Sequence, residues 1–138
     1  QRYRARISGP LLDRIDLHVE VGSLDENELV SAPAGETSAV IRERVARARA
    51  VQIERFKGSG LHSNSQMEPA HLQKFCALDK KSETLLRHAI REFNLSARAY
   101  DRILRVARTI ADLAASAGVS ESHIFEAINY RSLDKRLW

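Results

Sequence analysis

The sequence contains a single cysteine, Cys76, so an intramolecular disulfide is excluded. A chain without disulfides fits a reducing, cytosolic setting. In its context LQKFCALD, Cys76 is interpreted as a buried core thiol. Five histidines are present, and His62, His71, His88 and His123 show no ligand spacing with one another or with Cys76. We therefore expect no metal site.

Long apolar runs are also missing. No stretch is long enough to span a bilayer, and the basic start QRYRARISGP has no apolar core of a signal peptide. We therefore expect no membrane partner and a cytoplasmic location. The net charge of +4 permits anionic partners such as nucleic acid or nucleotide phosphates. A surplus this small does not by itself indicate nucleic-acid binding.

One segment near the start departs from the helical pattern of the rest. Residues 15–21 (IDLHVEV) alternate apolar and polar side chains, which is typical of a half-buried strand. No later segment resembles a second strand of similar quality. A buried strand needs partners for its backbone donors and acceptors, so the sequence raises the question of what this orphan strand pairs with.

The sequence after residue 36 predicts a small bundle of four or five amphipathic helices. Ile41, Val45 and Ala48 recur at helical spacing in the first helix and predict its core face. Residues 58–67 carry two glycines and small polar side chains, and they predict a loop. The expected helices cover 37–57, 69–76, 80–93, 97–117 and 121–130.

Capping residues mark where these helices begin and end. N-caps are expected at Thr37 or Ser38, Asp79, Ser96 and Ser120, because their side-chain oxygens accept hydrogen bonds from the free N–H groups of a first turn. Gly118 is expected to end helix 97–117, because glycine adopts the left-handed conformation common after helix C-termini.

Helix 97–117 carries three arginines on one face. With Arg98 at zero, Arg102 falls at about 40° and Arg105 at about −20°, opposite the apolar stripe. Asp101 lies off this face and is not expected to neutralise it. A solvated basic face is the ordinary alternative. The functional interpretation is a set of guanidiniums aimed at an anion such as phosphate, whose oxygens suit their planar fork.

Three stretches make the sequence familiar: YRARISGPLLDRIDLHVEV, LSARAYDRILRVARTIADLA and AINYRSLD. In this order and spacing they resemble the C-terminal part of the bacterial magnesium-chelatase-like AAA+ ATPases of the ComM/YifB group. The resemblance extends from Tyr3 to Asp134. It implies an AAA+ lid, 37–134, preceded by an extended segment, 1–36, that carries the last strand of an AAA+ α/β core, with residues 135–138 as a tail. Without the rest of that core, we expect strand 15–21 to be poorly ordered or to dock irregularly.

The resemblance also implies roles for particular arginines. Arg14, in LLDRIDL, matches the arginine finger that reaches the ATP of a neighbouring subunit. Arg98, in SARAYDRIL, matches the sensor-2 position that contacts the nucleotide, with Arg102 and Arg105 as weaker candidates for the same surface. Asn64-Ser65-Gln66-Met67 resembles a short polar family motif that contacts DNA or a neighbouring subunit, or else anchors its loop.

The sequence departs from the family pattern in one important respect. It contains no P-loop of the form G-x-x-x-x-G-K-[ST], so the fragment is not expected to bind ATP and Mg²⁺ or to hydrolyse ATP alone. The implied partners are an N-terminal P-loop half, a homo-oligomeric ring with a hexamer as its expected form, and DNA. The implied function is DNA remodelling, such as branch migration, in recombination or natural transformation. The alternatives are a stand-alone basic helical DNA-binding module and the motor subunit of a magnesium chelatase.

Overall fold

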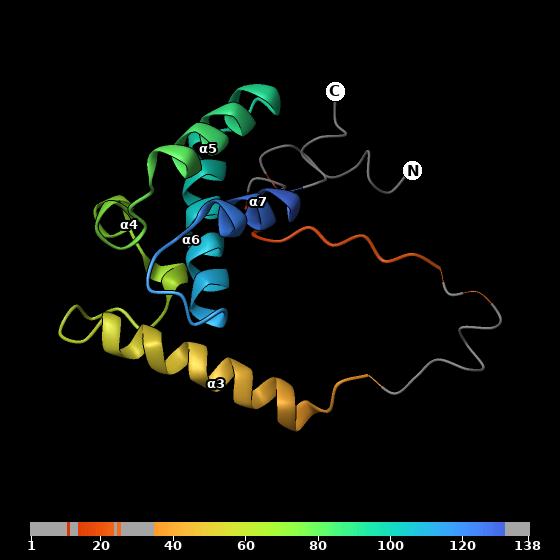
Figure 1. The fold of residues 1–138 in the computed structure, drawn as a ribbon, viewed down its shortest axis with the longest axis vertical. Coiled ribbons are helices and arrows are strands. Elements are labelled where there is room, and N and C mark those ends of the chain that lie inside the picture. Colours follow the sequence, from red (N-terminus) through yellow and green to blue (C-terminus); the bar gives the residue numbers. More distant parts are fainter. Residues whose placement is uncertain (1–10, 12–13, 24, 26–34, 132–138) are drawn as a thin grey trace.

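The computed structural model describes residues 11, 14–23, 25 and 35–131, and this part of the chain is helical (Figure 1). It contains the α-helices α3 (Ser38–Arg55), α4 (Pro69–Phe75), α5 (Lys80–Glu92), α6 (Ala97–Leu113) and α7 (Glu121–Asn129). A short 3-10 helix, η2 (Asn64–Gln66), lies between α3 and α4. The prediction of a small, mainly α bundle is confirmed. Among the described residues, no helix is long and apolar enough to cross a membrane.

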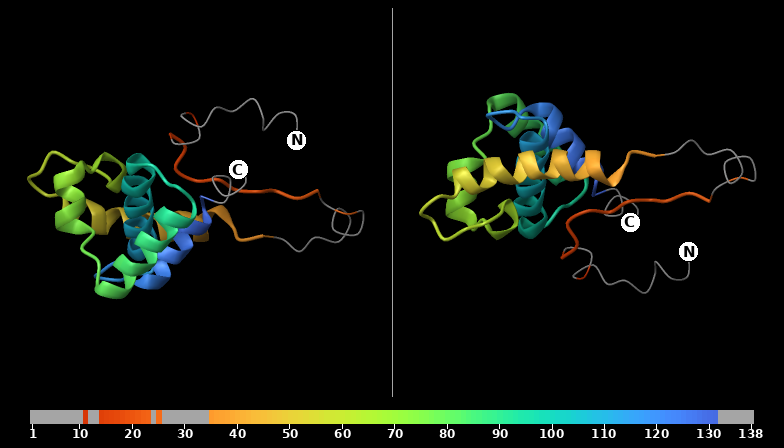
Figure 2. Two further views of the ribbon diagram at one scale, coloured as in Figure 1. Left: turned by 90° about the horizontal axis from the view of Figure 1, so that it is seen from above. Right: turned by 90° about the horizontal axis from the view of Figure 1, so that it is seen from below.

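Helix α6 runs through the middle of the bundle. It contacts α3, α4, α7 and η2, while α5 packs against α7 (Figures 1 and 2). Ala99, Ala107 and Ala111 are almost fully buried along α6, and their small side chains allow neighbouring helices to approach closely. The core around them is built from larger apolar side chains, namely Phe56, Met67, Leu72, Leu86, Ile103, Leu104, Ile124 and Ile128.

Segment 15–21, predicted as a strand, is extended but forms no strand. The described residues contain no neighbouring strand, and without one a ladder of backbone hydrogen bonds cannot form. The segment instead lies along the end of α7. His18 N donates to Tyr130 O at 2.7 Å, and Arg131 Nη1 donates to Ile15 O at 2.7 Å.

Helix α3 lies at the edge of the bundle, and its predicted core stripe is mostly uncovered. Ala48 is buried, as expected, but Ile41 and Val45 are exposed. Their assignment to the core was wrong because the first half of α3 extends beyond α6 (Figure 1). Only the second half of α3 has a neighbour to pack against.

The predicted N-caps are present. Ser96 Oγ accepts a hydrogen bond from Ala99 N at 3.2 Å, and Asp79 Oδ1 accepts one from Ser82 N at 2.8 Å. Thr37 Oγ1 accepts a longer one from Val40 N, at 3.4 Å. Ser120 begins α7 through a capping box with His123. These caps satisfy N–H groups that have no partner inside a helix.

The end of α6 differs from the prediction. The helix ends at Leu113, and the residue in the left-handed conformation is Ala115, with φ 54°, rather than Gly118. Ser116 N donates to Ala111 O at 2.8 Å and Ala115 N donates to Asp112 O at 3.1 Å, which is the Schellman pattern. The chain turns this early because Arg108, from inside the helix, holds the carbonyl oxygens of Ser116 and Ala117.

Replacing Ala115 with glycine is expected to raise the free energy of unfolding by about 1 kcal/mol, because an alanine Cβ is strained in the left-handed region and glycine is not. Urea unfolding at neutral pH measures the change. Ala114→Gly is the matched control, because Ala114 has an ordinary φ of −81° and should gain nothing. Equal stability of the two variants would contradict this account of the turn.

Candidate functional site

Of the three arginines predicted to form one face of α6, one has a free side chain and the other two are bound to neighbouring residues. Arg98, in the first turn, is exposed, and among the described residues its side chain makes no hydrogen bond or ion pair. Arg102 forms an ion pair with Asp16, and its side chain is only 23% exposed. Arg105 Nε donates to Met67 O at 2.9 Å. Of these three arginines, Arg98 alone has no donor engaged by a described residue, so all of its donors are available for an external anion.

Asp101 also contradicts the prediction that it leaves the arginine face unneutralised. Its Oδ2 lies 4.0 Å from Arg105 Nη2, one helical turn further along. This pair could have been predicted, because side chains four residues apart on a helix are neighbours. The cover of Arg105 could not, because a helical wheel treats α6 as a surface helix with one buried side. In the bundle α6 is central, and the loop that carries η2 covers the part of the face around Arg105.

Arg14 lies in a turn at the start of the extended segment, where its backbone N donates to Leu11 O at 3.0 Å. Its side chain is exposed and makes no hydrogen bond or ion pair within the described part of the chain. Two residues later, Asp16 is paired with Arg102 of α6. The segment that carries Arg14 is therefore attached to α6, which also carries Arg98. The guanidiniums of Arg14 and Arg98 are thus held by the same bundle.

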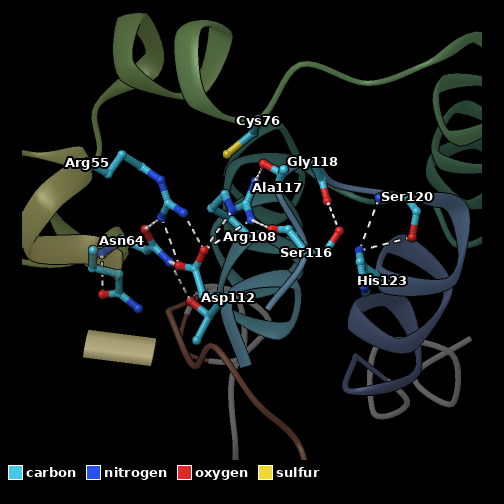
Figure 3. Close-up of polar contacts among 12 residues, drawn as sticks. Arg55, Asn64, Cys76, Arg108, Asp112, Ser116, Ala117, Gly118, Ser120 and His123 are labelled. Carbon is cyan, nitrogen blue, oxygen red and sulfur yellow. Dashed lines mark hydrogen bonds and ion pairs between the residues drawn. The ribbon is translucent and has the colours of Figure 1, made fainter. Parts of the chain in front are cut away.

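A buried charge cluster lies at the other end of α6 (Figure 3). We call it the Asp112 cluster, and it consists of Arg55, Asn64, Arg108 and Asp112. Arg55 Nη1 donates to Asp112 Oδ2 at 2.8 Å, and its Nη2 donates to the other carboxylate oxygen. Arg108 Nε donates to Oδ1 at 3.1 Å, and Asn64 Nδ2 donates to Oδ2 at 2.8 Å. One carboxylate therefore joins α3, the η2 loop and α6.

The electrostatics of the cluster favour an ionised Asp112. Burial raises the pKa of Asp112, but hydrogen bonds from Arg55 and Asn64, together with the charge of Arg108, outweigh burial and lower the pKa below its usual value. The charged form accepts the hydrogen bonds that the protonated form would lose. At neutral pH the carboxylate therefore holds two guanidiniums that lie largely out of water.

Asn64 has a clear role in this arrangement. Its Oδ1 accepts from Arg55 Nη1 at 3.0 Å, and its backbone N donates to Gln52 Oε1 at 3.2 Å. Its side chain is buried. Of the interpretations given to the motif 64–67, these contacts favour the one in which it anchors its loop. Ser65 and Gln66 of the same motif are exposed.

Sequence reasoning missed Arg55, Arg108 and Asp112. A signal was present for the last two, because Arg108 and Asp112 are four residues apart and form a local ion pair, 3.0 Å from Arg108 Nη2 to Asp112 Oδ1. Nothing local identified Arg55, which lies on another helix.

Cys76 is buried beside α6, as expected. Its Sγ lies 3.8 Å from Leu104 O. Burial raises the pKa of the thiol to about 11, so the nucleophilic thiolate is scarce at neutral pH. Cys76 is therefore a core residue.

Comparison with known proteins places these features in a family context. The family model described as "Magnesium chelatase, subunit ChlI C-terminal" matches residues 35–131, and the model described as "Magnesium chelatase, subunit ChlI" matches residues 1–29. Competence protein ComM of Haemophilus influenzae is 40% identical over 137 residues, and the uncharacterized protein YifB of Salmonella typhimurium is 38% identical over 141 residues. Each match covers 99% of this chain and 26% of the relative. The chain thus spans about a quarter of the length of these curated relatives.

Proposed function

Because the chain belongs to the magnesium-chelatase family, we propose that it is the C-terminal lid of a longer AAA+ ATPase and couples ATP binding and hydrolysis to motor action. The observation that carries this proposal is the free guanidinium of Arg98 at the start of the central helix α6. A group that senses phosphate needs unused donors and a rigid support, and Arg98 has both.

Arg98 is assigned the sensor-2 role. The first turn of a helix carries partial positive charge and attracts anions, and Ser96 fixes where this turn begins. Arg98 extends from that turn with a planar pair of donors that suits phosphate oxygens. Contact with the nucleotide there would draw α6, and with it the bundle, toward the bound phosphates. Arg102 and Arg105 already have protein partners, so we assign them a supporting role on this surface.

Arg14 is assigned the role of arginine finger, acting on nucleotide bound by the next subunit of a ring, with a hexamer as the expected form. In this proposal the part of the protein that precedes the present chain supplies the P-loop and holds ATP and Mg²⁺. The guanidinium of Arg14 would stabilise the negative charge that develops during phosphoryl transfer. Its exposure and unused donors support this assignment.

For the motor action we propose DNA remodelling in recombination or uptake of DNA. The support is the likeness to ComM, which is described as a competence protein. A magnesium-chelatase motor subunit is the second candidate, because that is what the matching family models describe. Stimulation of ATP turnover by DNA supports the first function, and turnover that depends on a porphyrin-binding partner supports the second.

The stand-alone DNA-binding module is the weaker alternative. It relies on the arginines of α3 and α6, but two of those on α3 are neutralised by neighbouring carboxylates. Arg44 forms a bidentate pair with Glu36, at 3.0 and 2.9 Å, and Arg47 pairs with Glu43 at 3.0 Å. Pairs of this kind reduce the number of phosphates that α3 can contact, and phosphate contacts supply non-specific affinity.

Arg98→Ala tests the proposed function in the protein that includes the preceding P-loop region. ATP turnover is expected to fall about 100-fold, as for removal of one donor that stabilises transition-state charge. Arg91→Ala is the matched control, because Arg91 is an exposed arginine that belongs to α5 and not to α6. Steady-state phosphate release measures both. Near-normal turnover in Arg98→Ala, or an equal loss in the control, would overturn the sensor-2 assignment.

A further inference from the structure

The first half of α3 presents an apolar face that nothing described here covers. Ile41, Val45 and Ala48 follow one another at helical spacing and therefore lie on one side of the helix. Ala48 is buried in the bundle, whereas Ile41 and Val45 are 41% and 47% exposed. The face that packs in the second half of α3 thus continues without a partner in the first half.

A cavity of about 300 Å³ lies beside α6 on the side of the extended segment. Val106, Ile110 and Leu113 of α6 form its apolar floor, and Asp16 and Leu17 of the segment form one wall. Segment 14–23 and the first half of α3 leave the bundle on the same side, as both views show (Figures 1 and 2). We call these two apolar surfaces together the open face: Leu17, Ile110 and Leu113 at the cavity, and Ile41 and Val45 on α3.

The family matches indicate what lies against the open face. Segment 14–23, which forms its wall, falls within residues 1–29, matched by the model of the chelatase subunit, whereas the bundle is matched by the C-terminal model. The wall therefore belongs to the unit that precedes the bundle in the family. About three quarters of the relatives' length lies outside the present match. A unit that folds onto segment 14–23 must also occupy the space next to it.

The charges around the open face disfavour a nucleic acid as its occupant. Arg44 lies at the edge of the Ile41 and Val45 face, and its guanidinium is held by both carboxylate oxygens of Glu36. Arg49, one turn beyond Val45, has no partner among the described residues. The lining of the cavity, however, is mainly apolar, and burial of apolar surface stabilises a complex by about 25 cal/mol per Å². An exposed apolar patch of this kind is typical of a protein contact.

We propose that the preceding part of the same polypeptide packs against the open face. The first half of α3 then forms part of the contact between core and lid. This rests on the proposed function, in which an ATPase core precedes the bundle. The second half of α3 ends at Arg55, which is bound to Asp112 of α6. A contact on the first half of α3 would therefore be connected, through one rigid helix and the Asp112 cluster, to the helix that carries Arg98.

Cysteine labelling tests the proposal. Val45→Cys places a thiol on the open face. Ala50→Cys is the matched control, because Ala50 is exposed and lies about 140° around the axis of α3 from Val45. Cys76 is a weak background because it is buried. Both variants are made in the 138-residue chain and in the protein with the preceding region. Maleimide labelling of each site is followed by peptide mass spectrometry, without nucleotide.

In the 138-residue chain, both introduced thiols should react at similar rates. In the longer protein, Val45→Cys is expected to react about tenfold more slowly, because reactivity follows exposure, while Ala50→Cys is unchanged. Equal rates of Val45→Cys in the two proteins would overturn the proposal. So would protection of the 138-residue chain that rises with its concentration, which indicates a second copy, or protection by an added DNA duplex.

Dilution tests the remaining candidate for the occupant of the open face, which is a neighbouring subunit of the ring. Protection within one polypeptide persists when the longer protein is diluted to monomers, and its loss on dilution would overturn the proposal. The outcome is also separable from that of the proposed function, since no nucleotide is present. If Arg98→Ala lowers ATP turnover as expected but Val45→Cys is not protected, only the docking proposal is refuted. If Val45→Cys is protected but Arg98→Ala leaves ATP turnover unchanged, only the sensor-2 assignment is refuted.

Discussion

Replacing Asp112 with alanine is expected to lower the free energy of unfolding by about 3–5 kcal/mol, because it leaves two guanidiniums largely out of water without their counter-charge. Arg108 is 2% exposed, and Arg55 is half-buried. Both donate to the Asp112 carboxylate, and Asn64 loses a partner as well. Since a domain is typically stable by only about 5–15 kcal/mol, this single change should remove much of the stability.

Urea unfolding of the 138-residue chain at neutral pH measures the effect. Asp101→Ala is the matched control, because Asp101 also pairs with an arginine of α6, but at 4.0 Å and with its side chain 31% exposed. Partly exposed pairs of this kind contribute about 0–1 kcal/mol. A loss in Asp112→Ala no larger than that in Asp101→Ala would show that the cluster does not hold the bundle together.

The same cluster predicts a dependence of stability on pH. The pKa of Asp112 is lowered in the folded chain, so its contribution is fully present above the pKa of an unfolded aspartate, about 3.9, and is lost as pH falls toward the folded value. The difference in unfolding free energy between the unaltered chain and Asp112→Asn should therefore be constant near neutrality and narrow below about pH 4. The difference between the two proteins is the informative quantity, because Asp79 also has a lowered pKa, owing to its hydrogen bonds with Ser82.

Features decided by neighbouring residues could be predicted from the sequence. The N-caps at Asp79, Ser96 and Ser120 depend on a side chain and the backbone about three residues later, and all three are present. Position in the bundle could not be predicted in the same way. The wheel of α6 gave the correct spacing of its arginines, but it could not show that the η2 loop would cover Arg105.

The Asp112 cluster and the end of α6 show why other features could not be predicted from the sequence. Arg55 and Asp112 are 57 residues apart in sequence and meet only when α3 packs against α6. Arg108 then holds the carbonyl oxygens of Ser116 and Ala117, so α6 ends before Gly118. The local sequence favours a helix end at Gly118, but the tertiary contact of Arg108 ends the helix earlier. The same holds for the candidate site. The sequence predicted that the arginines of α6 share one face, but the packing of the bundle determines which of their side chains stay free.

Replacing Arg14 with alanine is expected to lower kcat for ATP hydrolysis about 1,000-fold in the protein that includes the P-loop region, with little change in KM, because an arginine finger acts mainly on the transition state. The exposed Arg14 side chain has no partner among the described residues, so its removal should leave the fold intact. Arg91→Ala is the control. It removes an exposed arginine of α5 that has no assigned role in the site, and its effect on kcat should be much smaller.

Mixing subunits decides whether Arg14 acts on the neighbouring site. Arg14→Ala subunits lack the finger but keep an intact P-loop, and P-loop variants lack nucleotide binding but keep the finger. Where the two stand side by side in a ring, one interface contains both intact parts, so the mixture should recover activity that neither variant has alone. A slow Arg14→Ala enzyme without recovery on mixing would place the action of Arg14 within its own subunit. Near-normal turnover of the variant would remove the finger assignment altogether and leave Arg98 as the only phosphate contact proposed for the lid.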